Sequence, residues 1–247
     1  MAIIANQPYS LAAGYIDRVA IQLPPRPPVV WPVLVGDVPL LASAFQHRPG
    51  LRDRIDRAWA GHTSVVLSGG GGVGKSQLAA ARAQQALAAD TELAVWVNAV
   101  DTAQVITGYA AAALRVRAEG AQGQNAESDA RAFLEWLAAT SRSWLVVLDD
   151  VADTESIKLW WPPSSSNTDG RVLATSRRRD ALMSGGGRAV VDVGTYAPDE
   201  ALAYLRHRFT DTDTSRLLDA QATDLPRELG HLPLALSHAQ RLRSPTR

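Results

Sequence analysis

Cysteine is absent from the 247 residues, so the chain has no disulfide framework, no thiolate metal site and no cysteine nucleophile. An excess of charge is also missing, because 25 Lys and Arg residues balance 25 Asp and Glu residues. A neutral chain has no overall electrostatic attraction to nucleic acid or to an anionic membrane surface. Contacts with either would have to be local, and the sequence does not indicate nucleic acid as a partner.

Long hydrophobic segments are missing as well. No stretch reaches the roughly 18 apolar residues of a membrane-spanning helix, and the N-terminus has no basic region before a long apolar one. We therefore expect a cytoplasmic protein without a membrane partner. The histidines are scattered without metal-ligand spacing, which argues against a zinc site. With 46% hydrophobic residues, the chain has ample material for a folded core.

A glycine-rich stretch, VVLSGGGGVGKSQLAAARA at residues 65–83, joins an apolar segment to an alanine-rich one. Between a predicted strand and a predicted helix, the spacing GxxxxGKS is that of a phosphate-binding P-loop. Lys75 would reach the β- and γ-phosphates, and the Ser76 hydroxyl would bind Mg²⁺. A flexible surface turn would need neither residue. The predicted nucleotide-binding residues here are Gly69, Gly70, Gly71, Gly72, Val73, Gly74, Lys75, Ser76 and Gln77.

Short apolar segments alternate with helical patterns from Ser64 onward. We expect strands at Ser64–Ser68, Leu93–Asn98, Trp144–Asp149, Arg171–Thr175 and Ala189–Val193. Helices are expected at about Lys75–Ala88, Thr102–Arg117, Glu127–Ala139, Thr154–Leu159 and Arg178–Met183, with a further one, interrupted near Pro49, within residues 39–61. The alternation predicts an α/β fold, a three-layer P-loop NTPase core with a parallel five-stranded sheet.

The expected domains are an N-terminal segment with a proline-rich linker (1–34), a nucleotide-binding domain (35–196) and a small helical subdomain (197–247). Apolar Val29, Val30 and Trp31 favour a linker that packs on the domain over an SH3-type ligand. Trp160 and Trp161 precede two prolines and form either a patch for a partner or, more commonly, part of the core.

A second acidic element is needed for hydrolysis, and we expect it on a strand next to the P-loop strand. The segment WLVVLDD ends in two aspartates at the carboxyl tip of a predicted strand, where open α/β sheets bind ligands. Asp149 is predicted to hold Mg²⁺, and Asp150 to orient or deprotonate the attacking water. The alternative is that one of them caps a helix near Asp153.

The next predicted strand ends in the basic run RVLATSRRRD at residues 171–180. We assign Arg177 as the residue that senses the γ-phosphate, because a cation at that tip would face it. Arg178 and Arg179 are expected on a solvated helix face or in local ion pairs. The predicted catalytic set is Asp150, Arg177 and Lys75.

Six motifs follow one another over roughly residues 33–240: VLVGD, GGGGVGKS, VWVNA, LVVLDD, VLATSR and LGHLPLAL. In this order they resemble the NB-ARC nucleotide-binding domains of the STAND class of P-loop NTPases, including those of actinobacterial regulators. The chain departs from the family's usual Gly-Arg-x-x-Glu, because Gly36 is followed by Asp37, Val38, Pro39 and Leu40.

The resemblance implies an ATP/ADP-binding switch in signalling or transcription regulation, with slow Mg²⁺-dependent ATP hydrolysis at most. It implies that Pro233 packs on the adenine and that the Val35–Gly36 backbone lines the base pocket. The family's winged-helix and repeat domains would follow this chain, which we therefore expect to be part of a larger protein. A nucleotide-dependent homo-oligomer is a further expected partner.

Two other functions stay open at this point. One is a P-loop small-molecule kinase, in which Asp150 would activate a substrate hydroxyl. The other is an AAA+-like DNA-directed ATPase, which would present an arginine finger such as Arg188 or Arg206 to a neighbour. Release of phosphate from ATP, with and without acceptors or DNA, would separate them.

Overall fold

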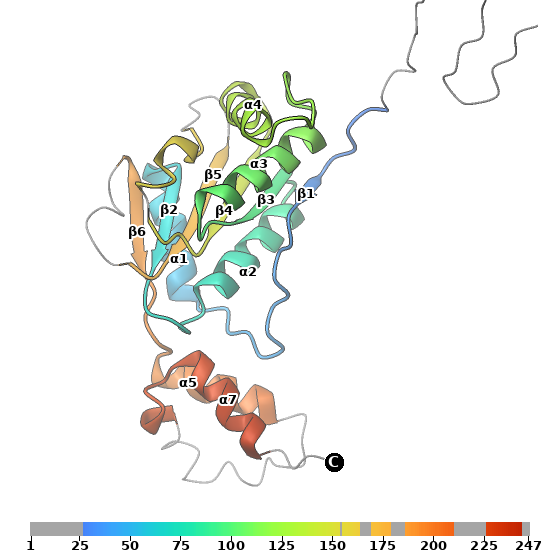
Figure 1. Cartoon of the computed structure of the whole chain (residues 1–247). Helices are drawn as coiled ribbons and strands as arrows, with labels where there is room; N and C mark the ends of the chain where they lie inside the picture. The colour runs from blue at the N-terminus through green and yellow to red at the C-terminus, as the bar shows by residue number, and fades with distance from the viewer. Residues whose placement is uncertain (1–26, 154, 164–168, 179–185, 210–225, 244–247) are drawn as a thin grey trace, which may run out of the picture.

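Six parallel strands form one sheet in the order β1-β3-β4-β5-β2-β6 (Figure 1). The computed structural model describes residues 27–153, 155–163, 169–178, 186–209 and 226–243. The strands are β1 (Val33–Val35), β2 (Ser64–Ser68), β3 (Leu93–Asn98), β4 (Trp144–Asp149), β5 (Gly170–Ser176) and β6 (Arg188–Asp192). The expected α/β fold is confirmed, but the number of strands is wrong by one. The additional strand, β1, pairs with β3 at the edge of the sheet.

The helices are α1 (Pro49–Gly61), α2 (Lys75–Ala88), α3 (Thr102–Val116), α4 (Ala126–Ala139), the 3₁₀ helix η1 (Lys158–Trp160), α5 (Pro198–Phe209) and α7 (Pro233–Arg243). Side-chain caps determine where two of them begin. The carboxylate of Asp101 accepts from Gln104 N at the start of α3, and the amide oxygen of Asn125 accepts from Ser128 N at the start of α4. Each cap satisfies a backbone donor that has no partner within the helix.

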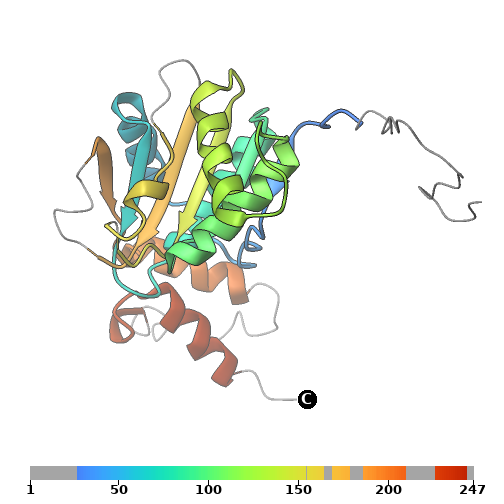
Figure 2. The same cartoon turned by 45° about the horizontal axis from the view of Figure 1, so that its top comes forward.

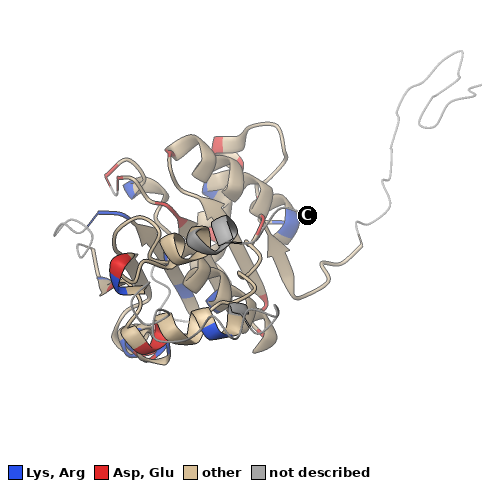
Figure 3. Cartoon of the chain, turned by 90° about the horizontal axis from the view of Figure 1, so that it is seen from below, with Lys and Arg blue, Asp and Glu red and all other residues tan. Residues whose placement is uncertain are grey.

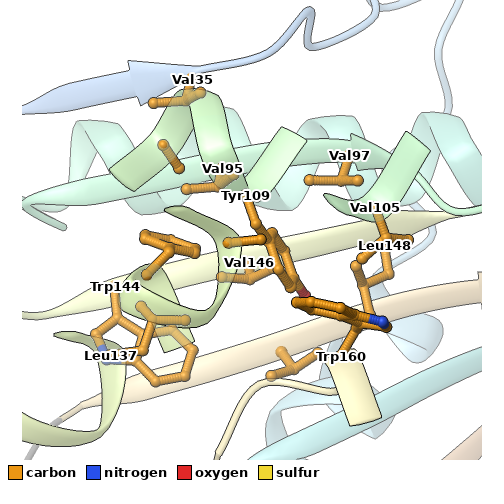
Figure 4. Packing of buried hydrophobic residues seen from close by; sticks show 14 of the residues in the cluster. Val35, Val95, Val97, Val105, Tyr109, Leu137, Trp144, Val146, Leu148 and Trp160 are labelled. Carbon is orange, nitrogen blue, oxygen red and sulfur yellow. The ribbon is translucent and has the colours of Figure 1, made fainter. Parts of the chain in front are cut away.

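Helices cover both faces of the sheet, so the core has two halves. Along β4 the side chains alternate between the faces, as they do in any strand. Val146 and Leu148 pack beneath α3 and α4 with Tyr109 and Trp160, as Figure 4 shows. Leu145 and Val147 pack on the opposite face with residues of α1 and α2. This is the three-layer arrangement that the sequence predicts.

The segment before β1 packs on the core. Trp31 stacks on Trp136 of α4 with 6.2 Å between ring centroids, and the guanidinium of Arg142 lies 4.2 Å from the Trp31 ring. Val29 is partly buried against the same cluster, whereas Val30 is 83% exposed. The prediction that this part of the linker packs on the domain is confirmed.

Trp160 is buried, and the half-buried Trp161 donates its indole N–H to the Ser64 hydroxyl at 3.1 Å. The two tryptophans therefore pack into the fold and do not form an exposed docking patch.

Two predicted helices differ in the structure. Within 154–159, described apart from residue 154, the expected α-helix is replaced by turns and η1, because Asp153 Oδ1 accepts from Glu155 N and Ser156 Oγ donates to Asp153 O. Residues 39–48 have no helix, and α1 begins only at Pro49. Most of the predicted helix Arg178–Met183 lies outside the described residues.

A third cluster joins α5 and α7 to the segment before α1. Its buried members are Ala44, Ala201, Tyr204, Leu205 and Leu236. Figures 1 and 2 show α5 and α7 beyond one end of the sheet, and strand-end residues and residues of both helices line one cavity there. Seen from this end, acidic and basic residues are intermingled (Figure 3). The helical subdomain and its boundary at residue 197 stay a prediction.

Candidate functional site

The P-loop connects the end of β2 to the start of α2. Gly72 and Gly74 have positive φ values of 75° and 94°, a conformation that favours glycine. A Cβ at Gly69 would lie 2.3 Å from the carbonyl oxygen of Val193, so only glycine fits against the chain that leaves β6. Val73 is buried among residues of α1, α2 and the sheet, which anchors the loop. Its backbone N–H groups and the α2 N-terminus together suit an anion.

Lys75 is the first residue of α2 and is only 8% exposed. Its ammonium donates to the carbonyl oxygens of Gly69 and Gly70, each at 2.8 Å. The positive charge is thereby held over the loop and lines the cavity that the loop borders.

Asp149, the last residue of β4, lies beside Ser76. Asp149 Oδ1 accepts hydrogen bonds from Ser76 Oγ at 2.7 Å and from Thr175 Oγ1 at 2.6 Å. Thr175 is buried at the end of β5, and sequence reasoning did not single it out.

The strand order corrects one expectation. β4 does not neighbour β2, because β5 pairs with both and lies between them. The intervening strand delivers the Thr175 hydroxyl to the gap between the P-loop and Asp149. The local pattern of a strand does not encode which strand it pairs with, so this order could not be predicted from the segments one by one.

Asp150 adopts the left-handed conformation, with φ 60°, and its backbone N–H donates to Thr175 Oγ1 at 2.8 Å. Its carboxylate pairs with the guanidinium of Arg177 at 3.3 Å. No α-helix begins in the described residues near Asp153, so nothing there is capped by Asp150. The structure thus brings together Asp150 and Arg177, two of the predicted catalytic residues.

Two further arginines, Arg178 and Arg179, follow Arg177 in the basic run. Arg178 pairs with Asp153 at 3.4 Å, as expected of a local ion pair. Arg179 lies outside the described residues.

These groups line a cavity of about 1030 Å³. Of the predicted site residues, those that line it are Gly36, Gly71, Gly72, Val73, Gly74, Lys75, Ser76, Gln77, Asp149, Asp150, Arg177 and Pro233. Val35, Gly69 and Gly70 are not among its lining residues, and the side chain of Val35 is buried in the core. A Cβ at Gly36, where φ is 83°, would lie 2.0 Å from Trp96 O, so glycine is required there.

Helix α7 contacts the P-loop directly. Leu234 N donates to Gly72 O at 3.3 Å, and Pro233 lines the cavity beside it. The segment 36–48, which precedes α1, forms another wall of the cavity. There Gln77 donates to Leu40 O at 3.1 Å and accepts from Ala42 N at 2.7 Å. The loop, the strand ends and α7 therefore share one cavity.

Among the lining residues that sequence reasoning missed are Phe45, Arg48, Tyr196 and Tyr204. Burial raises the pKa of Tyr196 to about 12, so its phenol is neutral near pH 7. Arg48 is charged yet only 8% exposed. An arginine next to Pro49, where the predicted helix is interrupted, carries no local signal of burial.

A magnesium ion would find oxygen donors here. Ser76 Oγ and Asp149 Oδ1 lie 2.7 Å apart at the mouth of the P-loop, and hydroxyl, carboxylate, phosphate and water oxygens are the ligands that Mg²⁺ prefers. Across the part of the chain that the structure describes, no group of three or more His, Asp or Glu residues could hold a metal ion by itself. The residues present fit an ion that phosphates and water help to hold. None of the described helices has the length and apolar character to cross a bilayer.

Comparisons with known proteins agree with the fold. A family model described as the NB-ARC domain matches residues 52–214. Among solved structures, the chain is similar to a Signal Transduction ATPase with Numerous Domains (STAND) protein with a tetratricopeptide repeat sensor from Pyrococcus horikoshii, with 18% identity and a TM-score of 0.55. That match covers 81% of this chain and 30% of the other, so this chain spans less than a third of that protein's length.

A Walker-type ATPase of Pyrococcus abyssi is similar at 12% identity and a TM-score of 0.56, over 82% of this chain and 69% of that one. At such identities both likenesses concern the fold. A search of curated proteins finds no match.

Proposed function

This chain belongs to the NB-ARC domain family of STAND-class P-loop NTPases, and we propose that it is a switch whose state depends on whether ATP or ADP is bound. Nucleotide binding follows from the family. The adenine preference, the hydrolysis and the regulatory role are the proposed parts.

The observation that carries the proposal is the single cavity of about 1030 Å³ shared by the P-loop, the two aspartates and α7. Its size suits a nucleotide, since ligand pockets commonly measure about 300 to 1,000 Å³. Lys75 and the loop amides would bind the phosphates. Gly36 and Pro233 border the part of the cavity that we assign to the adenine.

We expect hydrolysis to be slow, for a reason that lies in Asp150. Ser76 and Asp149 would hold Mg²⁺, which would polarise the phosphate and neutralise its developing charge. Asp150 would orient the attacking water, but its carboxylate is paired with Arg177 at 3.3 Å. The carboxylate must leave this pair before it can accept a proton, and Arg177 would contact the γ-phosphate once it is released.

In the whole protein, we assign to this domain the control of a signalling or transcription output through winged-helix and repeat domains, with a nucleotide-dependent homo-oligomer as the active form. The tetratricopeptide repeat sensor in the name of the Pyrococcus horikoshii protein supports the repeat domains of this organisation.

The test is to identify the nucleotide that co-purifies with the chain and to measure phosphate release from ATP. We expect bound ADP or ATP and slow release that neither DNA nor hydroxyl acceptors accelerate. Transfer of the phosphoryl group to an acceptor would favour a kinase, and acceleration by DNA would favour a DNA-directed ATPase. Failure to bind any adenine nucleotide, in calorimetry on the folded chain, would overturn the proposal.

A further inference from the structure

Arg48 combines two unusual properties in one residue. It precedes the first residue of α1 and has φ 43°, in the left-handed region that arginine rarely adopts. Its side chain is only 8% exposed although it is charged. A strained backbone and a buried charge persist only where surrounding contacts stabilise them.

The contacts of Arg48 reach the connection between β6 and α5. Arg48 Nη1 donates to Gly194 O at 3.0 Å, and Nη2 donates to Thr195 O at 2.8 Å. Arg48 Nε donates to Glu200 in the first turn of α5, with 3.1 Å to the nearer carboxylate oxygen. One guanidinium thus bonds to two backbone carbonyls and one carboxylate, about 150 residues away along the chain.

The same guanidinium lies over an aromatic ring that borders the cavity. Arg48 Cζ is 5.4 Å from the centroid of Tyr196, and the rings of Tyr196 and Tyr204 are 5.9 Å apart. Tyr196 N also donates to His231 O at 3.0 Å, just before α7. Arg48, Tyr196 and Tyr204 all line the cavity. The connection between β6 and α5, α5 itself and the residue before α7 therefore meet at Tyr196, the ring on which Arg48 stacks.

We infer that Arg48 is a positioning residue that holds residues 194–196, between β6 and α5, against the core. Tyr196 and Tyr204 then form a wall of the cavity for the nucleoside part of the nucleotide. This inference rests on the proposed function, because it assigns the cavity to a nucleotide. Arg48 donates its hydrogen bonds to residues 194–195 and to α5, whereas Lys75 donates to the P-loop. Loss of the Arg48 guanidinium should therefore weaken nucleoside binding and leave phosphate binding intact.

The experiment compares two ligands, ADP and inorganic pyrophosphate, by calorimetry on the full chain. Arg48→Met keeps the apolar stem and removes the guanidinium. We expect at least a tenfold weaker affinity for ADP and less than a twofold change for pyrophosphate. Arg48→Lys keeps the charge but loses the fork of donors, so it should restore ADP affinity only in part.

Arg54→Met is the matched control. Arg54 lies on α1, the helix that Arg48 precedes, and also donates to a backbone carbonyl near the end of β6, Asp192 O at 3.1 Å, but it is exposed and does not line the cavity. It should change neither affinity. Glu200→Gln is the second variant should Arg48→Met not fold, because its amide oxygen still accepts from Ala197 N. It should weaken ADP binding and spare pyrophosphate.

Hydrogen exchange separates a failure of this inference from a failure of the proposed function. In Arg48→Met, the amides of Ala201 and Leu205 should exchange at least tenfold faster, whichever ligand the cavity binds. Unchanged ADP affinity, or an equal loss for ADP and pyrophosphate, would overturn the positioning role. A wild-type chain that binds neither ligand would overturn the proposed function. If the Ala201 and Leu205 amides of Arg48→Met then exchanged at the wild-type rate, the positioning role of Arg48 would be rejected as well.

Discussion

Lys75 provides the positive charge of the P-loop, and in this structure two carbonyl oxygens of the loop hold its ammonium at 2.8 Å. In a nucleotide complex, phosphate oxygens would take the place of these carbonyls. Charge-assisted hydrogen bonds are about twice as strong as neutral ones. We expect Lys75→Ala to lower ADP and ATP affinity at least about 100-fold, or about 2.7 kcal/mol, in calorimetry.

Lys158→Ala is the control for this variant, because Lys158 is exposed and pairs with Glu155 at 3.5 Å. It should bind nucleotide like the wild type. Unchanged affinity in folded Lys75→Ala would contradict the P-loop assignment.

Asp150 allows binding and turnover to be separated at one residue. Asp150→Asn should abolish slow ATP hydrolysis and leave ADP affinity within about twofold, since Ser76 and Asp149 are the residues that would hold Mg²⁺. The measurement is phosphate release under single-turnover conditions beside a binding isotherm. Asp153→Asn changes a nearby carboxylate that pairs with Arg178 instead, and it should hydrolyse at the wild-type rate. Equal rates in Asp150→Asn and the wild type would leave Asp150 a structural carboxylate.

At the scale of elements, the P-loop depends on how closely β6 approaches it. Gly69→Ala would place a Cβ 2.3 Å from Val193 O, whereas a Cβ at Gly70 meets nothing within 4 Å. Val193 N also donates to Ser68 O at 2.7 Å, so the backbone cannot move away without losing that hydrogen bond. We expect Gly69→Ala to destabilise the chain by about 1 to 3 kcal/mol and Gly70→Ala by less than about 1 kcal/mol. Thermal unfolding without nucleotide measures both, and equal stabilities would refute the close approach.

The elements that sequence predicted well have strong local signals. Helix α2 matches its predicted bounds because a glycine-rich loop and an alanine-rich pattern mark both its start and its course. Strand β1 was missed because three residues between Pro32 and Gly36 are too few to show a period. The helix expected at 154–159 failed because side chains of Asp153 and Ser156 bond to the local backbone instead.

The residues of the candidate site also fall into those with a local sequence signal and those without one. Gly74, Lys75 and Ser76 are neighbours in the sequence, so their spacing alone predicts where a phosphate would bind. Arg48 bonds to Gly194, Thr195 and Glu200, and contacts over such separations leave no periodic or spacing signal. The strand order that inserts β5 between β2 and β4 is likewise a property of the assembled sheet.

For the whole molecule, the helical subdomain should decide base selectivity. The buried residues of the two clusters that flank the sheet all precede residue 197, so a chain that ends at Ala197 should keep a folded sheet. It would lose α5 and α7, and with them Tyr204 and Pro233 of the cavity wall. Covering one face of an adenine contributes about 1 to 3 kcal/mol.

We therefore expect the shortened chain to bind ADP at least tenfold more weakly and to discriminate poorly between ADP and GDP. Circular dichroism verifies the sheet, and binding isotherms on both lengths give the affinities. Equal affinity and equal selectivity would show that residues before the helical subdomain hold the base.

The position of β2 in the sheet also affects how the chain is made. β2 ends at Ser68, yet both of its partners, β5 (Gly170–Ser176) and β6 (Arg188–Asp192), follow about a hundred residues later. A ribosome adds about 5 to 20 residues per second, so the apolar strand that bears the P-loop waits several seconds or more without its partners. Pairings so distant along the chain also form slowly. During translation, nucleotide can therefore bind only once the sheet is nearly complete. Until then β2 has no paired neighbours and is accessible to chaperones.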